Sequence, residues 1–126
     1  MKNVIFTPEA PAPIGPYNQA ILKNDTLYIS GQIPINPKTG EVISDSIEAE
    51  TKQVMENLNA ILLAAGMTFE NVVKTSIFII NMNDFASINA VYGSYLNETT
   101  APARETVQVS CLPKNVNIEI SMIAML

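Results

Sequence analysis

The sequence contains no histidine, and its only cysteine is Cys111. Zinc sites, Ser-His-Asp triads and Cys-His dyads all normally need an imidazole, so the composition argues against these three kinds of catalytic site. One cysteine cannot close a disulfide within the chain. That agrees with a reducing environment and predicts a cytoplasmic protein.

Positive charge is also scarce. The seven lysines and arginines are scattered, and the formal net charge is −5. No stripe of positive charge is available to bind phosphates, so the sequence predicts no nucleic-acid partner. No apolar run approaches the roughly 20 residues of a membrane helix, which predicts no membrane association. The five glycines form neither a Walker loop nor a GxGxxG motif. Any catalysis therefore depends on carboxylate, guanidinium, hydroxyl, phenol and backbone groups, with no metal site.

The remaining composition is that of a folded globular protein. A chain of 126 residues with 48 % apolar and 15 % charged residues fits one domain, residues 1–126. Four prolines between residues 8 and 16 predict an extended loop. Apolar periodicity predicts strands at 17–23 and 26–31 joined by a tight turn, a helix at 44–66, a strand at 72–81 buried on both faces, and a helix from 83 or 84 to 96. These elements indicate an α+β fold.

The segment 102–122 predicts two alternating strands joined by a turn near Pro113 and Lys114. Val107, Val109 and Cys111 are expected on an apolar face, and Arg104, Thr106 and Gln108 on a polar face that also holds Glu119. In this hairpin Glu119 would lie opposite Gln108, about 13 Å along the strand from Arg104. One chain would join the two charges only through long side chains or a bulge. A neighbouring subunit could instead supply one of them.

Arg104 and Glu119 are the candidate functional residues. A guanidinium grips a carboxylate with two parallel hydrogen bonds, and a half-buried glutamate can have its pKa raised toward neutrality. Together they suggest a site for a small acid. Two plainer readings stay open: Arg104 as an ordinary surface residue, and Glu119 as a solvated strand residue or the partner in an interfacial ion pair.

Several short motifs are distributed along essentially the whole chain. Each motif alone is a weak signal, but their common order and spacing are specific. They include Ile14-Gly15-Pro16-Tyr17, Ser30-Gly31-Gln32-Ile33-Pro34, Asn83-Asp84-Phe85 with Asn89, Pro102-Ala103-Arg104, Leu112-Pro113-Lys114 and Ile118-Glu119-Ile120. In these residues the chain resembles the reactive intermediate deaminases, the Rid or YjgF family.

This resemblance implies a chorismate-mutase-like α+β fold, with two helices packed on one face of a mixed sheet, and a homotrimer with sites between subunits. It implies hydrolysis of short 2-imino acids, such as 2-iminobutanoate and 2-iminopropanoate, to 2-keto acids and ammonia, without a metal or organic cofactor. Arg104 would hold the substrate carboxylate and Glu119 would activate or position water. The resemblance places Tyr17, Ser30, Gly31 and Asn89 in the pocket.

The chain differs from the family at one place. Members commonly have Arg-Ser-Cys where this chain has Arg104, Glu105 and Thr106. Alternation puts Thr106 on the same face as Arg104, so a hydroxyl replaces a thiol in the pocket wall. An alternative function is a non-catalytic trimer that senses small keto or amino acids or acts as a chaperone-like partner. Such a module would need Arg104 but not Glu119.

Overall fold

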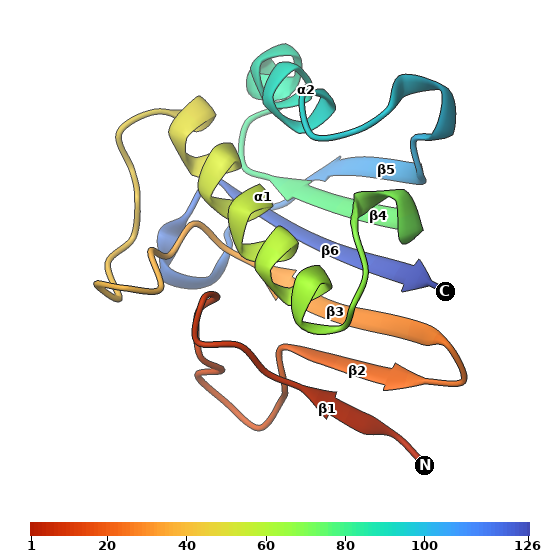
Figure 1. Cartoon of the computed structure of the whole chain (residues 1–126). Helices are drawn as coiled ribbons and strands as arrows, with labels where there is room; N and C mark the ends of the chain where they lie inside the picture. The colour runs from red at the N-terminus through yellow and green to blue at the C-terminus, as the bar shows by residue number, and fades with distance from the viewer.

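The computed structural model describes residues 1–126, and it folds as a six-stranded mixed sheet with two helices packed on one face (Figure 1). The strands follow the order β1-β2-β3-β6-β4-β5 across the sheet. The elements are β1 (Asn3–Ile5), β2 (Ala20–Lys23), β3 (Thr26–Gln32), α1 (Ile47–Ala64), β4 (Val72–Ile79), α2 (Phe85–Gly93), β5 (Ala103–Gln108) and β6 (Ile118–Met125). The α+β class with both helices on one face is as predicted.

The first hairpin and the long helix agree with their sequence signals. Asn24 and Asp25, both with positive φ, turn the chain between β2 and β3. The Ser46 side chain caps α1 by accepting a hydrogen bond from the amide of Ala49. Beyond the other end of α1, Gly66 adopts φ of 74°, the left-handed conformation that favours glycine.

The predicted hairpin between the last two strands is wrong, because β4 lies between them. β5 pairs with β4 in parallel, whereas β6 pairs with β4 antiparallel. A parallel crossover through α2 delivers β5 to the far side of β4, and the nine residues 109–117 then return the chain across β4. That connection is longer than a tight turn needs.

The two faces of β5 are also the reverse of those predicted. Arg104 and Thr106 stand level with the fully buried Thr75 and Ile77 of β4, so they face the helices, and Val107 faces away from them. Alternation separates the faces of a strand but does not say which face is covered. Here the helix-side face of an edge strand holds polar groups.

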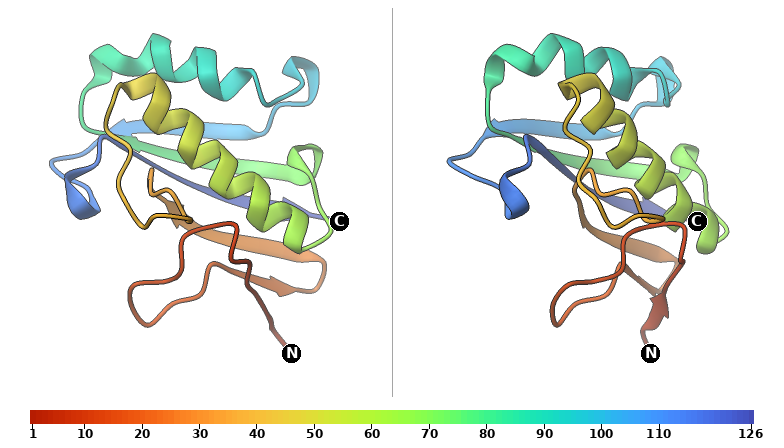
Figure 2. Two further views of the ribbon diagram at one scale, coloured as in Figure 1. Left: turned by 60° about the vertical axis from the view of Figure 1, so that its left-hand side comes forward. Right: turned by 90° about the vertical axis from the view of Figure 1, so that its left-hand side faces the viewer.

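The two helices lie over the same face of the sheet (Figure 2). The hydrophobic core is formed by side chains of the helices and of this face. α1 contributes the fully buried Val54, Leu58 and Ile61, which meet Ile118 and Ile120 of β6 in that core. The burial of these apolar side chains is the main stabilising contribution to the fold. It also fixes the register of β6, because a slip of one residue would turn its apolar side chains out of the core.

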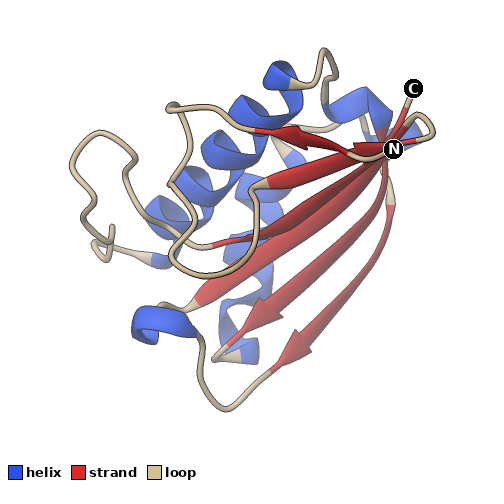
Figure 3. Ribbon diagram, turned by 90° about the horizontal axis from the view of Figure 1, so that it is seen from below, coloured by secondary structure: helices blue, strands red, loops and turns tan.

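No helix covers the second face of the sheet, which we call the open face (Figure 3). The prediction that the strand at 72–81 is buried on both faces is therefore wrong, since Lys74, Ser76 and Phe78 on this side of β4 are only partly buried. Four large apolar side chains are at least 39 % exposed on the open face: Val4, Tyr28, Val107 and Met125. Exposed apolar groups on one surface are typical of protein contact sites.

Candidate active site

Arg104 lies on the helix side of β5, where α2 holds its guanidinium in place. One guanidinium nitrogen donates to the Asn89 side-chain oxygen at 2.7 Å. The guanidinium carbon lies 5.1 Å from the centre of the Tyr92 ring and 5.6 Å from that of Phe85, both of which are cation–π distances. The side chain is therefore oriented by one hydrogen bond and two aromatic rings.

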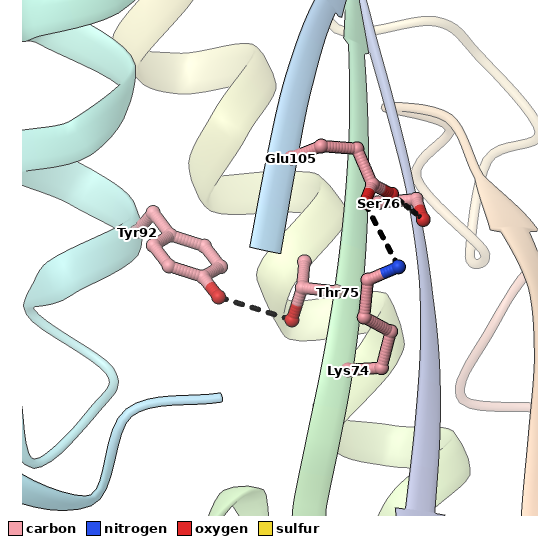
Figure 4. A network of polar contacts seen from close by, with 5 residues as sticks. All are labelled: Lys74, Thr75, Ser76, Tyr92 and Glu105. Atoms are coloured by element: carbon pink, nitrogen blue, oxygen red, sulfur yellow. Dashed lines mark hydrogen bonds and ion pairs between the residues drawn. The ribbon is translucent and has the colours of Figure 1, made fainter. Parts of the chain in front are cut away.

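Tyr92 is itself fixed by a contact to the sheet. Its hydroxyl hydrogen-bonds the Thr75 hydroxyl at 3.0 Å on the helix side of β4 (Figure 4). Burial raises the pKa of the Tyr92 hydroxyl, so this ring stays neutral near pH 7. A neutral ring at this distance packs beside the guanidinium without neutralising it.

A cavity of about 550 Å³, here called the Arg104 cavity, opens beside this guanidinium. It is lined by Asn89, Tyr92, Gly93, Leu96, Glu98, Ala101 and Arg104. No carboxylate lies within 4.0 Å of Arg104, because the structure's one ion pair joins Lys74 to Glu105. The guanidinium thus keeps donors for a carboxylate ligand.

Thr106 lies two residues beyond Arg104 on the same side of β5. Its hydroxyl oxygen is buried and has no hydrogen-bond partner. Buried polar atoms are nearly always paired in folded proteins, so an unpaired one beside a candidate site is a candidate ligand contact. The placement of Thr106 beside Arg104 is as the sequence predicts, although both lie on the helix side.

Glu119 lies on the open face, in β6, and is partly buried. Burial raises the pKa of its carboxyl group. The carboxylate packs directly against Gly31 of β3, where an added Cβ would lie 2.7 Å from the Glu119 carboxyl carbon. Glycine at position 31 leaves the space that the Glu119 carboxylate occupies, so Gly31 and Glu119 form one local unit.

Tyr17 and Ser30 lie nearby on the open face, together lining a groove of about 460 Å³. The Tyr17 hydroxyl accepts a hydrogen bond from the Ile14 amide at 3.3 Å, and the ring is 46 % exposed. The Ser30 hydroxyl donates to the Asn18 carbonyl at 2.6 Å. Ser30 therefore holds the loop before β2, while Tyr17 offers an accessible phenol.

The predicted residues thus form two half-sites in one chain. The Arg104 half-site, defined as Arg104, Asn89 and Thr106, lies on the helix side of the sheet. The Glu119 half-site, defined as Glu119, Gly31, Ser30 and Tyr17, lies on the open face. Arg104 pairs with Thr75 of β4, and Thr75 pairs with Met122 of β6, so Arg104 and Met122 lie at the same level of the sheet. Glu119 therefore lies three residues along the strand direction and two strands across from Arg104. These offsets are each about 10 Å. The prediction that Arg104 and Glu119 share a face is wrong, because Arg104 lies on the face of the sheet that the helices cover.

The matching family model, described as endoribonuclease L-PSP, covers residues 7–126. The chain belongs to the YjgF/Rid family. A RutC family protein from Pyrococcus horikoshii is 54 % identical over 124 residues, covering 98 % of each chain. Human 2-iminobutanoate/2-iminopropanoate deaminase is 44 % identical over 124 residues, covering 98 % of this chain and 90 % of the human one. The crystal structure of E. coli TdcF with bound serine has a TM-score of 0.92 at 41 % identity, covering 98 % of both chains.

In this Rid-family chain, sequence reasoning missed Gln19, which orders the proline-rich loop beside Tyr17. Gln19 accepts from the Thr7 amide at 2.8 Å and donates to the carbonyls of Thr7, Ala10 and Pro11 at 2.9–3.2 Å. A segment with many prolines has few amide donors of its own, so its carbonyls need a partner from elsewhere. A polar residue that follows such a segment and immediately precedes a strand was the available signal.

Sequence reasoning also missed Glu50, which is 2 % exposed in the first turn of α1. Its carboxylate accepts hydrogen bonds from the backbone amide of Asn117 at 3.0 Å and from the Asn117 side chain at 2.7 Å. Asn117 immediately precedes β6, so Glu50 fixes the start of the strand that presents Glu119. An acidic residue in the first turn of a helix is usually explained by its favourable interaction with the helix dipole. The sequence therefore contained no sign that Glu50 binds Asn117.

Glu105, where this Rid-family chain departs from the common pattern, lies on the open face. Its carboxylate forms an ion pair with the Lys74 ammonium group at 2.8 Å and accepts a hydrogen bond from the Ser76 hydroxyl (Figure 4). The hydrogen bond from Lys74 and the one from Ser76 hold the pKa of Glu105 below its usual range. Glu105 is thus a fixed anion on the face opposite to Arg104.

No group of three His, Cys, Asp or Glu side chains is placed to hold a metal ion. Neither helix combines the length and the apolar character that a membrane crossing requires.

Proposed function

We propose that this protein hydrolyses short 2-imino acids, such as 2-iminobutanoate, to 2-keto acids and ammonia at sites formed between neighbouring copies of the chain. The main observation in support is that an unneutralised guanidinium and a desolvated carboxylate lie on opposite sides of one sheet. Neither half-site can use the other within one chain. The imine deaminase activity named for the human relative agrees with this reaction.

The two half-sites have complementary chemistry. Arg104 binds the substrate carboxylate with its free donors, while Asn89 and Tyr92 keep the guanidinium oriented. Glu119 accepts a proton from water, whose oxygen attacks C2 of the protonated imine. The resulting carbinolamine takes that proton from Glu119 on its nitrogen. The C–N bond then breaks as the hydroxyl oxygen forms the keto C=O and returns its proton to Glu119, which passes this proton to the departing ammonia. Because a protonated imine is already electrophilic, positioning both reactants supplies much of the acceleration.

Assembly also tunes the proposed base. Burial alone raises the pKa of Glu119. A guanidinium from the neighbouring copy favours the charged carboxylate, and so opposes this rise. The neighbouring guanidinium thereby helps to keep the carboxylate ionised, which is the form that accepts a proton from water.

A ring of subunits satisfies this arrangement. The Arg104 half-site and the Glu119 half-site are unlike surfaces, and a contact between unlike surfaces generates a ring when its rotation closes. Three copies is the ring size that the family resemblance implies. The exposed apolar side chains of the open face, Val4, Tyr28, Val107 and Met125, supply a surface for such contacts.

A second candidate is a binding module without turnover. The TdcF structure contains serine, which has no imine to hydrolyse. A carboxylate receptor of this kind requires Arg104 and not Glu119. Cleavage of RNA, which the description of the family model names, is disfavoured by the net charge of −5.

A coupled assay separates these functions. An amino-acid oxidase generates 2-iminobutanoate in the presence of semicarbazide, and hydrolysis by the added protein lowers the yield of semicarbazone. We expect the wild type to lower it, and Arg104→Ala and Glu119→Gln each to lose at least about 100-fold in rate. Glu41→Gln, a charge-matched change at an exposed turn, should retain full activity. Full turnover by Glu119→Gln would contradict the mechanism, and binding without turnover by the wild type would favour the binding module.

A further inference from the structure

The Arg104 cavity contains a second charge of opposite sign that the reaction described above does not use. Glu98 lines the cavity together with Arg104. The two side chains form no ion pair, because no carboxylate lies within 4.0 Å of the guanidinium. One cavity therefore presents a free cation and a free anion on its wall.

Glu98 lies in a short 3₁₀ turn, Glu98–Thr100, that is held without its help. The Asn97 side chain accepts from the Thr99 amide at 3.0 Å and caps this turn. At the other end the Thr100 hydroxyl donates to the Glu70 carboxylate at 3.0 Å. The Glu98 side chain is exposed and makes no hydrogen bond or ion pair, so no contact within the chain accounts for its charge at the cavity.

The rest of the wall limits the size and polarity of the ligand. Gly93, Leu96 and Ala101 are the small or apolar members, and they lie beside Asn89 and Tyr92. An α-amino or α-imino acid has a carboxylate for Arg104 and a positively charged nitrogen for Glu98. A short apolar side chain suits the remaining wall.

We infer that Glu98 is a specificity-determining residue. It makes the Arg104 cavity a receptor for small zwitterions with one carboxylate and one cationic nitrogen, and it disfavours ligands with a second carboxylate. As a statement about substrates, this rests on the proposed function. As a statement about binding, it stands on the cavity alone.

The size of the discrimination follows from electrostatics. Two carboxylates within one partly solvated cavity repel each other by an amount that corresponds to about three- to tenfold in affinity. Salt screens charges that are exposed to solvent, so the discrimination should shrink as ionic strength rises. A purely steric effect of Glu98 would not depend on salt.

The test compares two imines on the full-length protein. One oxidase generates 2-iminobutanoate, and a glutamate oxidase generates the dicarboxylic 2-iminoglutarate. We expect Glu98→Gln to raise the ratio of kcat/KM for 2-iminoglutarate over 2-iminobutanoate about three- to tenfold at low salt. Glu98→Asp, which keeps the charge, should leave the ratio near the wild-type value. Glu70→Gln is the matched control, because it changes the same charge at a residue that holds the same turn from outside the cavity.

Binding of non-reacting zwitterions gives an independent readout. Calorimetry with serine and with aspartate should show the same change in preference for Glu98→Gln. If the wild type hydrolyses neither imine but this preference still changes, the proposed function fails and the role of Glu98 stands. An unchanged preference in both assays, or no binding of either amino acid, would overturn the inference.

Discussion

Arg104 and Glu119, the two residues of the proposed reaction, are each positioned by neighbouring groups. The guanidinium of Arg104 is oriented by Asn89 and by the rings of Tyr92 and Phe85, yet no carboxylate neutralises it. Burial raises the pKa of Glu119, and Gly31 leaves the space that its carboxylate occupies. Both side chains are positioned by neighbours that leave their charge available to a ligand.

Removal of Arg104 should change the titration of Glu119 if the two meet across a subunit contact. A nearby cation lowers a carboxyl pKa, so Arg104→Ala should raise the pKa of Glu119 above its wild-type value. The carboxyl carbon of Glu119 can be followed by ¹³C NMR on the full-length protein. Lys38→Ala, a loss of charge at an exposed loop, is the control and should leave the titration unchanged. An unchanged titration in Arg104→Ala would mean that the two groups never come close.

Gly31→Ala should displace the Glu119 carboxylate while leaving the backbone intact. Gly31 does not adopt a positive φ, so alanine fits its backbone conformation, and the three atoms nearest to the added Cβ all belong to the Glu119 side chain. We expect a loss of at least about tenfold in kcat/KM and of about 1–3 kcal/mol in the free energy of unfolding. Denaturant unfolding and the imine assay measure both quantities.

The same substitution in a Glu119→Ala background is the control. With the carboxylate removed, Gly31→Ala should cost little stability, and a double-mutant cycle reports the difference. An equal cost in both backgrounds would place the conflict elsewhere.

At the scale of elements, the sequence predicted those that have a strong local signal. The apolar stripe of the helix predicted at 44–66 corresponds to α1, and Asn24-Asp25 marked the first hairpin. Pairing between distant strands has no such signal. Because β5 and β6 are consecutive in the sequence, their pattern predicted a hairpin. In the structure β4 lies between them, since the crossover through α2 places β5 on the far side of β4. Local patterns therefore predicted most of the elements that carry the candidate site residues, whereas the prediction of which face Arg104 lies on was wrong.

Glu50→Ala should loosen the junction between α1 and β6. The substitution leaves the Asn117 amide and side chain without their acceptor, and we expect a loss of about 2–4 kcal/mol in the free energy of unfolding. Glu48→Ala is the matched control, since Glu48 lies in the same first turn but is exposed and forms no bond to Asn117. Chemical denaturation of both variants tests this prediction. Equal losses would mean that the helix dipole, and not the contact with β6, accounts for the role of Glu50.

At the scale of the whole molecule, the layered fold itself separates the two charges. A sheet with helices on one side only has two chemically different faces, and here each face presents one half of the proposed site. The open face also exposes the apolar side chains Val4, Tyr28, Val107 and Met125. Under the proposed mechanism a single chain would be a poor catalyst by itself, whereas a ring of copies would bring the two half-sites together at every contact.

The most direct test of this account is complementation between two inactive variants. Arg104→Ala and Glu119→Gln chains are co-expressed in equal amounts, and the purified assembly is assayed for hydrolysis of 2-iminobutanoate. A contact between a Glu119→Gln chain and an Arg104→Ala chain can combine an intact Arg104 with an intact Glu119. Random assembly therefore predicts recovery of about one quarter of the wild-type activity. A mixed assembly no more active than either variant alone would contradict a site shared between chains.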